Sequence, residues 1–267
     1  MKEKIKIERL TKTFEVRNAK NGRSTKTFTA IENLDFQIYE GEFLTIVGPS
    51  GCGKSTLLDL LAGLTLPTKG RIFIDGREIT GPGLDRGIVF QQYALFPWKS
   101  ARGNIEFGLE AKGVPKSQWK EKTEQLLKLV GLEKFSDHYP HELSGGMKQR
   151  IAIARSLAFD PDVLLMDEPF AALDAQTRET LQTELLHIWK KTKKTIVFIT
   201  HDIDEAVYLG ERVVVLTPNP GRVKKIIDIP QKNHLTKSDI QANPEIIKVK
   251  SEIWNLLHET EYEGAYI

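Results

Sequence analysis

The sequence is poor in cysteine, lacks long apolar runs and carries almost no net charge. Its 267 residues contain a single cysteine, which excludes a disulfide framework and fits a reducing compartment. No apolar run approaches the roughly eighteen residues that cross a bilayer, so we expect no membrane span. The first residues are charged and lack the apolar core of a signal peptide, which predicts a cytoplasmic protein. The 38 basic and 36 acidic residues nearly cancel, so nucleic acid is not expected as a partner.

The apolar pattern predicts an α/β fold. Apolar residues make up 40% of the chain, enough for a core of ordinary size. Alternating patterns near the N-terminus, at residues 4–8 and 31–38, predict an antiparallel part. Continuous apolar runs that alternate with helical stretches predict a mostly parallel sheet. The predicted buried strands are residues 42–47, 163–167, 195–200 and 213–216, and the predicted helices are 56–62, one capped by Ser117, 147–157, 175–191 and one that starts at Pro244.

A glycine-rich stretch lies between the first buried strand and the first predicted helix. It fits the phosphate-binding pattern Gly-x-x-x-x-Gly-Lys-Ser/Thr. Its glycines let the backbone wrap an anion, and the N–H groups at the helix start then face the phosphates. Lys54 is predicted to reach the β- and γ-phosphates of a nucleotide, and Ser55 to hold Mg²⁺. The residues expected to contact nucleotide here are Gly48, Pro49, Ser50, Gly51, Cys52, Gly53, Lys54, Ser55 and Thr56.

Polar side chains follow two further buried strands. Asp167 and Glu168 come at the end of residues 163–167, and His201 follows residues 195–200. In a P-loop enzyme an acid at this place orders the Mg²⁺ shell, and the next carboxylate can orient or deprotonate the attacking water. The carboxyl ends of parallel strands meet at one edge of a sheet, so Gly48, Asp167 and His201 are expected to converge on one crevice.

A second pair of glycines, Gly145 and Gly146, carries a different signal. Ser144 precedes them and is placed to cap a helix, which makes a second helix N-terminus able to bind an anion. One nucleotide does not need two such sites from one chain. Here the sequence resembles the ATP-binding subunits of ABC transporters, whose signature is Leu-Ser-Gly-Gly-Gln. This chain has the same residues except for Met147, which replaces the final glutamine. The resemblance runs from about residue 5 to residue 216, in the family's order.

The resemblance implies a role for each of the loops that match the family's motifs. In that family the signature of one subunit caps the γ-phosphate held by the P-loop of the other. Gln91 matches the glutamine that links Mg²⁺ and water to the transmembrane partner, and Asp174 matches the loop that crosses the dimer interface. His201 matches the histidine that contacts the γ-phosphate. Phe14 is the candidate for stacking on adenine, with Phe28 as its competitor and core packing as the alternative.

These assignments give three sets of site residues: nucleotide contacts, catalytic residues and Mg²⁺ ligands. Nucleotide contacts are expected from the P-loop, from Phe14 and Asp174, and from the signature residues of the second subunit. The implied catalytic residues are Lys54, Gln91, Glu168 and His201, and the implied Mg²⁺ ligands are Ser55, Gln91 and Asp167.

The resemblance also implies domain organisation and partners. The expected fold is a P-loop NTPase of ABC type with a mostly parallel core sheet, an antiparallel N-terminal β subdomain and a helical signature subdomain. Residues 1–230 would form the ATPase domain, with its helical subdomain at about 92–160, and residues 231–267 a short C-terminal helical extension. The chain would dimerise with a second copy or a homologous ATPase subunit around two MgATP. It would act on transmembrane permease subunits, and through them on a periplasmic or lipid-anchored solute-binding protein, at the cytoplasmic face of the cell membrane.

Three short segments point to one branch of that family. Residues 93–98 read Tyr-Ala-Leu-Phe-Pro-Trp, which indicates either a partner groove or core burial. In the family this segment receives a coupling helix from the permease. Together with residues 81–86 and 218–222, it looks like the nitrate, sulfonate and taurine importer branch. The solute is not specified, and an anion, a sulfonate or a thiamine-like heterocycle all remain open.

Two alternatives are less well supported. Soluble ABC ATPases that act on nucleic acid or ribosomes usually carry two P-loops or a coiled-coil insertion, and neither occurs here. A generic P-loop kinase would have no use for Ser144 or His201.

Two local expectations concern side chains outside this scheme. Cys52 lies among the N–H groups of the P-loop, where a thiolate would be favoured, and the alternative is a small filler residue. The basic, polar stretch at residues 17–26 is expected to be a solvated hairpin tip.

Overall fold

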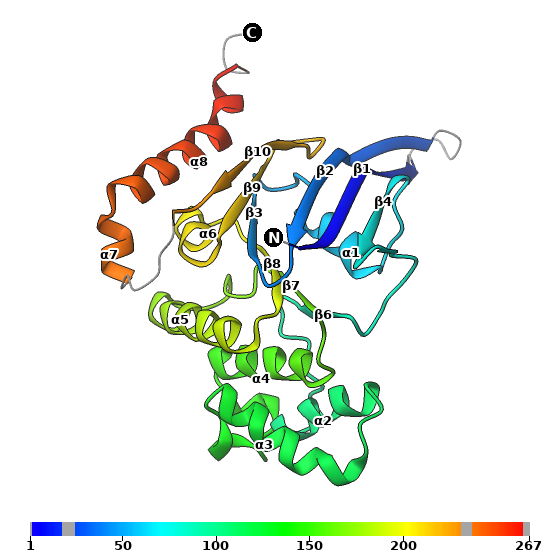
Figure 1. Ribbon diagram of the computed structural model, residues 1–267, viewed down its shortest axis with the longest axis vertical. Coiled ribbons are helices and arrows are strands. Elements are labelled where there is room, and N and C mark those ends of the chain that lie inside the picture. The colour runs from blue at the N-terminus through cyan, green and yellow to red at the C-terminus, as the bar shows by residue number, and fades with distance from the viewer. Residues whose placement is uncertain (1, 18–24, 231–236, 264–267) are drawn as a thin grey trace. The chain divides into compact units, whose positions relative to one another are not determined.

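The computed structural model describes residues 2–17, 25–230 and 237–263. The chain divides into two compact units, one of residues 1–82 with 197–267 and one of residues 83–196. Figure 1 shows the elements of both units. Among the described residues, no helix is long and apolar enough to span a membrane.

An antiparallel sheet forms the N-terminal part of the first unit. Its strands are β1 (Glu3–Arg17), β2 (Thr25–Tyr39), β4 (Lys69–Ile74) and β5 (Arg77–Glu78), in the order β2-β1-β4-β5. β1 and β2 are longer than the predicted strands, and the register shifts between Ile7 and Leu10, where Arg9 has a positive φ of 44°. Such a bulge lets a long hairpin bend while its apolar face stays buried. Residues 18–24 of the expected hairpin tip lie outside the described residues.

Short, fully apolar strands form the parallel part of the first unit. β3 (Phe43–Val47) is buried throughout and pairs in parallel with β9 (Arg212–Leu216), as continuous apolar runs predict. β10 (Val223–Asp228) adds to β9 in antiparallel fashion. β8 (Thr195–Ile199) crosses the division between the units. The helices of this unit are α1 (Lys54–Ala62), α6 (Ile203–Leu209), α7 (Lys237–Ala242) and α8 (Pro244–Glu263).

Helix α8 is anchored to the first unit by its apolar side. Ile246 and Ile253 are completely buried and share a cluster with Val47 of β3 and Val213 of β9. Helix α8 therefore completes the apolar core that packs against β3, the strand that leads to the phosphate loop.

Helices dominate the second unit. The unit also contains two strands that pair in parallel, β6 (Arg86–Val89) and β7 (Val163–Asp167). The α-helices are α2 (Ala101–Ala111), α3 (Trp119–Leu129), α4 (Gly145–Ala158) and α5 (Ala175–Thr192), with 3₁₀ turns at Lys116–Gln118, Glu133–Phe135 and Pro140–Glu142. α2 and α3 both pack on α4 (Figure 1). This arrangement places the start of α4 and the loop after β6 within one unit.

The expected cap at Ser117 is wrong. Ser117 lies inside the 3₁₀ turn, and α3 begins at Trp119 without a side-chain cap. The Trp119 indole donates to the Val114 carbonyl at 2.7 Å, which holds the turn before the helix starts. Leu127 and Val130 are buried as expected, whereas Leu126 is only half-buried.

Candidate functional site

The predicted phosphate loop lies between β3 and α1 in the first unit. α1 begins at Lys54, two residues before the predicted start. The Lys54 ammonium turns back into the loop, where it donates to the carbonyls of Gly48 at 2.7 Å and Pro49 at 3.1 Å. Lys54 is buried, so its charge is held by backbone geometry at the centre of the loop. An ammonium fixed in this way is suited to charge-assisted hydrogen bonds with phosphate oxygens.

Two of the loop glycines are required by the local geometry. Gly53 caps α1 with a φ of 91°, and a methyl group there would lie 2.5 Å from Cγ2 of Ile31. A methyl group on Gly48 would lie 2.5 Å from Sγ of Cys52. Because Gly53 makes no side-chain cap, the first N–H groups of α1 remain suited to an external acceptor such as phosphate.

The loop after β9, residues 217–222, packs against the phosphate loop at Gly221. Gly221 donates from its N–H to the Ala30 carbonyl and accepts from the Glu32 N–H, both at 2.9 Å. A methyl group on Gly221 would lie 2.0 Å from the Cys52 carbonyl oxygen. The sequence of residues 218–222 indicates only the branch of the family, because this contact depends on a distant strand that no local pattern reveals.

The expected thiolate at Cys52 is wrong. The side chain is completely buried, and that burial raises the pKa of the thiol above its ordinary value. The nearby Lys54 charge lowers this pKa, but by less than burial raises it. Cys52 is therefore a small filler beside Gly48.

His201 follows β8 at the same edge of the first unit as the phosphate loop. The Thr200 N–H donates to the Ile46 carbonyl at 3.2 Å, which sets the end of β8 beside β3. The Thr200 hydroxyl donates to the buried Glu205 carboxylate and accepts from the Asp202 N–H at 3.0 Å. These bonds fix the backbone on both sides of the exposed His201. Asp167 belongs to the other unit, so its expected convergence with Gly48 and His201 stays a prediction.

Phe14 and Phe28 are direct partners across the β1–β2 ladder. They are 39% and 44% exposed, so the alternative of core packing is wrong. The Lys12 ammonium lies 5.1 Å from the centre of the Phe14 ring. Either ring presents a face to solvent, and the choice between them for adenine stacking stays a prediction.

The carboxylates predicted to serve catalysis lie at the end of β7 in the second unit. Asp167 is the last residue of the strand, and both it and Glu168 are half-buried. Glu168 has a φ of 42°, a left-handed conformation that is costly for a residue with a Cβ and is enriched at functional sites.

The predicted Mg²⁺ ligands Ser55, Gln91 and Asp167 offer the oxygen atoms that this ion prefers. Among the described residues, no group of three or more histidine, cysteine or acidic side chains could cage a metal. A sparse set of oxygen donors fits Mg²⁺, which is usually bound through one or two protein ligands and substrate phosphates.

The predicted signature stretch starts helix α4. The Ser144 hydroxyl caps the helix by accepting from the Met147 N–H at 3.3 Å, and the helix begins at Gly145 rather than at Met147. A methyl group on Gly145 would lie 3.1 Å from Cδ2 of Leu173, and one on Gly146 would lie 2.7 Å from Cγ2 of Thr177. The glycines thus let the segment that contains Asp174 approach the start of α4.

Asp174 itself caps helix α5. Its carboxylate accepts from the Thr177 N–H at 3.0 Å, and this bond lowers the pKa of the Asp174 carboxyl. The second unit therefore brings Ser144, Gly145, Gly146 and Asp174 together.

The segment after Gln91 presents aromatic rings to solvent. Gln91 is exposed and follows β6. The ring of Phe96 lies 5.6 Å from Trp98 and 4.6 Å from Phe107, between centroids, and Trp98 is 71% exposed. Core burial therefore does not explain this cluster, and its role as a partner surface stays a prediction.

Two polar residues that sequence analysis missed hold this segment. Asn104 is completely buried in α2 and bonds to the backbone of Phe96. Arg155 of α4 donates to the carbonyls of Tyr93 and Ala94. The partners of Arg155 lie far away along the chain. A single asparagine or arginine does not indicate a structural role by itself, so no local sequence pattern could have identified these two residues.

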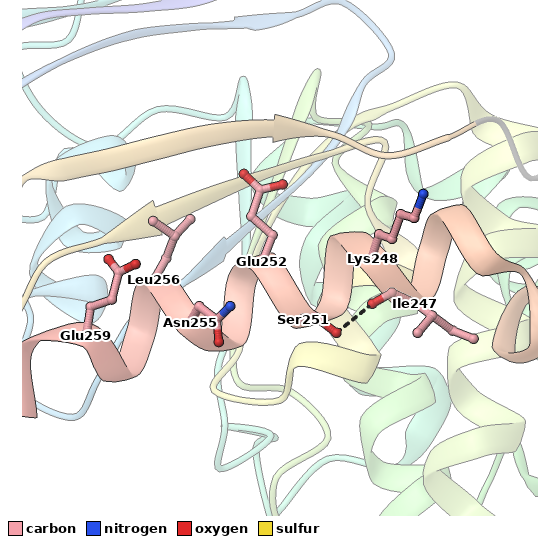
Figure 2. A pocket seen from close by; sticks show the side chains of 7 residues that line it. All are labelled: Ile247, Lys248, Ser251, Glu252, Asn255, Leu256 and Glu259. Atoms are coloured by element: carbon pink, nitrogen blue, oxygen red, sulfur yellow. Dashed lines mark hydrogen bonds between the residues drawn. The ribbon is translucent and has the colours of Figure 1, made fainter. Parts of the chain in front are cut away.

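Helix α8 carries a shallow hollow. The residues that line it are far along the chain from every residue predicted to bind nucleotide. The hollow has a volume of about 490 Å³, and Figure 2 shows that one helix supplies its lining. Its residues are Ile247, Lys248, Ser251, Glu252, Asn255, Leu256 and Glu259. Glu252 and Glu259 pair with Lys225 and Lys224, so these charges serve to fasten the helix.

Comparison with known proteins agrees with this arrangement. Residues 31–171 match the ABC transporter family. An uncharacterized ABC transporter ATP-binding protein of Methanocaldococcus jannaschii is 54% identical over 97% of this chain and 93% of its own. The nitrate import ATP-binding protein NrtD of Synechocystis is 49% identical over 88% of this chain and 90% of its own. The taurine import ATP-binding protein TauB of Roseobacter denitrificans is 44% identical over 97% and 96%.

Solved structures show the same fold. A dimeric ATP-binding cassette in a post-hydrolysis state with ADP and Pi aligns with a TM-score of 0.72 and 34% identity, over 85% of this chain and 99% of that one. The cbiO1 protein of Clostridium perfringens, part of the ABC transporter complex cbiONQ, aligns with a TM-score of 0.75 and 30% identity, over 98% and 100%. The chain belongs to the ABC transporter family, as an ATP-binding subunit whose ATPase activity is coupled to transport.

Proposed function

We propose that this protein is the ATPase subunit of an importer for a small anionic solute such as nitrate, a sulfonate or taurine. The observation that carries the proposal is the presence of two separate helix starts with the glycines and caps suited to anion binding, at Lys54 of α1 and after Ser144 at α4. Two relatives that match most of the chain are named for nitrate and taurine import. The three branch-specific segments of the sequence support the same solute class.

The two helix starts would act on ATP from different copies of the chain. Lys54 and the first turn of α1 would bind the β- and γ-phosphates, and Ser144, Gly145 and Gly146 of a second copy would close over the γ-phosphate. Ser144 already holds the first turn of its helix in place through the Met147 N–H. Two MgATP would thus join two subunits, and hydrolysis would release them because it removes contacts on both sides.

Hydrolysis in this arrangement depends on position and charge rather than on covalent catalysis. Glu168 would orient or deprotonate the attacking water, and its fixed left-handed backbone keeps the carboxylate at the end of β7. His201, held by Thr200 and Asp202, would contact the γ-phosphate. Bound Mg²⁺ would neutralise phosphate charge, with Ser55, Asp167 and Gln91 as its protein ligands. Phe14 or Phe28 would stack on adenine.

The exposed aromatic cluster after Gln91 would receive the permease. Phe96, Trp98 and Phe107 offer adjacent rings at the surface of the second unit. Docking there would place the subunit at the cytoplasmic face of the cell membrane, with a periplasmic or lipid-anchored solute-binding protein contacted only through the permease. Residues 1–230 would form the ATPase domain and residues 231–267 its extension.

The decisive experiment uses Glu168→Gln. We expect this variant to bind MgATP, to hydrolyse it at least about a hundredfold more slowly, and to accumulate as a dimer in size-exclusion chromatography. Lys54→Ala in the same background is the control and should remain monomeric because it loses phosphate binding. Near-normal turnover by Glu168→Gln, or a monomer that hydrolyses ATP at full rate, would contradict the proposal.

The solute class has its own test. The chain and its permease would be reconstituted in vesicles, and ATPase activity measured with nitrate or taurine and the binding protein. Stimulation by either solute supports the importer, whereas stimulation by nucleic acid without any permease would support the rival class.

A further inference from the structure

The loop that follows Gln91 has an unusual backbone. Tyr93 and Ala94 have φ values of 51° and 49°, so two consecutive residues with side chains are left-handed. This conformation costs free energy at each residue and persists only where the surroundings impose it. The contacts that impose it come from helix α4.

Arg155 supplies the first contact. Its two terminal nitrogens donate to the Ala94 carbonyl at 2.6 Å and to the Tyr93 carbonyl at 3.3 Å. Its guanidinium carbon lies 5.4 Å from the centre of the Phe96 ring. A planar fork can hold two carbonyls and stack on a ring at once, which a lysine ammonium does less well. Arg155 therefore ties the left-handed pair to the middle of α4.

Tyr93 supplies the second contact. A methyl group on Gly145 would lie 3.0 Å from the Tyr93 hydroxyl oxygen, so the tyrosine reaches the first turn of the same helix. Gly145 directly follows the capping Ser144. The loop therefore meets α4 at two points: the Tyr93 hydroxyl lies beside the first signature glycine, and Arg155 bonds to the loop further along the helix.

We propose that Tyr93 and Arg155 are positioning residues that make the loop after Gln91 and the first turn of α4 move as one body. A permease bound at Phe96 and Trp98 would then set the position of Ser144 and Gly145, and with it the ability of this copy to close over the ATP of the second copy. This inference rests on the proposed function, because it assumes closure by the signature residues in trans. Neither residue is among those proposed to contact nucleotide.

The test uses Arg155→Lys and Tyr93→Ala in the Glu168→Gln background. We expect the MgATP-dependent dimerisation constant to fall at least about fivefold, the lower limit of a typical coupling effect. Binding of a fluorescent ATP analogue to the monomer should stay within about twofold, because the phosphate loop lies in the other unit. A loss of dimer without a loss of nucleotide affinity is a result that general unfolding would not produce.

Arg150→Lys is the matched control. Arg150 lies on the same helix and pairs with Glu184 of α5 at 2.6 Å, and among the described residues it makes no hydrogen bond to the loop after Gln91. Its dimerisation should match that of the parent. Equal dimerisation of Arg155→Lys, Tyr93→Ala and Arg150→Lys would overturn the inference, as would parallel losses of dimer and nucleotide binding. Failure of the Glu168→Gln parent to dimerise would instead overturn the proposed function.

Discussion

Asn104 gives the sharpest test of how the segment after Gln91 is held. Its side chain is completely buried in the first turn of α2. The amide oxygen accepts from the Phe96 N–H at 2.9 Å. The amide nitrogen donates to the carbonyls of Phe96 at 3.2 Å, Lys99 at 3.0 Å and Ser100 at 3.0 Å. One side chain thus bonds to four backbone groups of the turn that precedes α2.

The expected cost of Asn104→Ala follows from these bonds. The substitution leaves the Phe96 N–H and the Lys99 carbonyl without their amide partner, whereas the Phe96 carbonyl still accepts from the Lys99 N–H at 3.1 Å. Each unsatisfied buried group costs about 1–3 kcal/mol. Phe96 is only half-buried, so water recovers part of that loss. The Ser100 carbonyl still accepts from the Asn104 N–H at 2.9 Å and adds little. We therefore expect the free energy of unfolding to fall by about 2–4 kcal/mol.

Guanidinium unfolding followed by circular dichroism measures this change, and hydrogen exchange at the Phe96 amide locates it. Asn255→Ala is the control, because Asn255 is an exposed residue on α8, and its effect should stay within about 0.5 kcal/mol. Asn104→Asp keeps the acceptor for Phe96 and loses the donors, so its exchange protection should lie between those of the other two. If Asn104→Ala destabilises no more than Asn255→Ala, the reasoning from buried hydrogen bonds is refuted.

Three further predictions concern other buried groups. Gly221→Ala should weaken MgATP binding at least about tenfold in a fluorescence titration, since its methyl group would lie 2.0 Å from the Cys52 carbonyl; unchanged affinity would contradict the bracing role of this loop. Gln149 is completely buried, and neither of its amide atoms has a hydrogen-bond partner among the residues that the structure describes, so Gln149→Met should raise the free energy of unfolding by about 1–3 kcal/mol; a loss of stability on denaturant titration would argue against this. Cys52 should react with iodoacetamide at pH 8 far more slowly in the folded chain than in guanidinium, because burial raises its pKa and blocks access. Equal labelling rates in the folded and unfolded chain would contradict the burial of Cys52. The raised pKa of the Cys52 thiol also means that its contribution to the free energy of unfolding is present below the pKa of the unfolded thiol and is lost as pH rises through the pKa of the folded thiol.

The buried strands could be predicted because their signal is local and continuous. The run at residues 163–167 became β7 with the same bounds, and Ser144 proved to be a cap because a cap needs only the next three residues. Helix α2 escaped prediction because Gly103 and Gly108 weaken its helical pattern. Gly108 is present for a tertiary reason, since a methyl group there would lie 2.6 Å from the Arg155 carbonyl.

The predicted site residues were found by motif, whereas the residues that support them were not. The phosphate loop and the signature have fixed spacings, so Lys54 and Ser144 could be named from the sequence. The roles of Arg155 and Gly221 depend on contacts with Ala94 and Ala30, which lie far away along the chain. Cys52 was misjudged because motif position says nothing about burial, and burial decides the pKa of its thiol.

The packing of α8 has a practical consequence for protein engineering. Ile246 and Ile253 cover Val47 and Val213, and Val47 is the last residue of the strand before the phosphate loop. A recombinant fragment that stops at residue 230 would expose this apolar patch and tend to aggregate. Expression plasmids and reporter fusions for this chain should therefore retain it at least to residue 263.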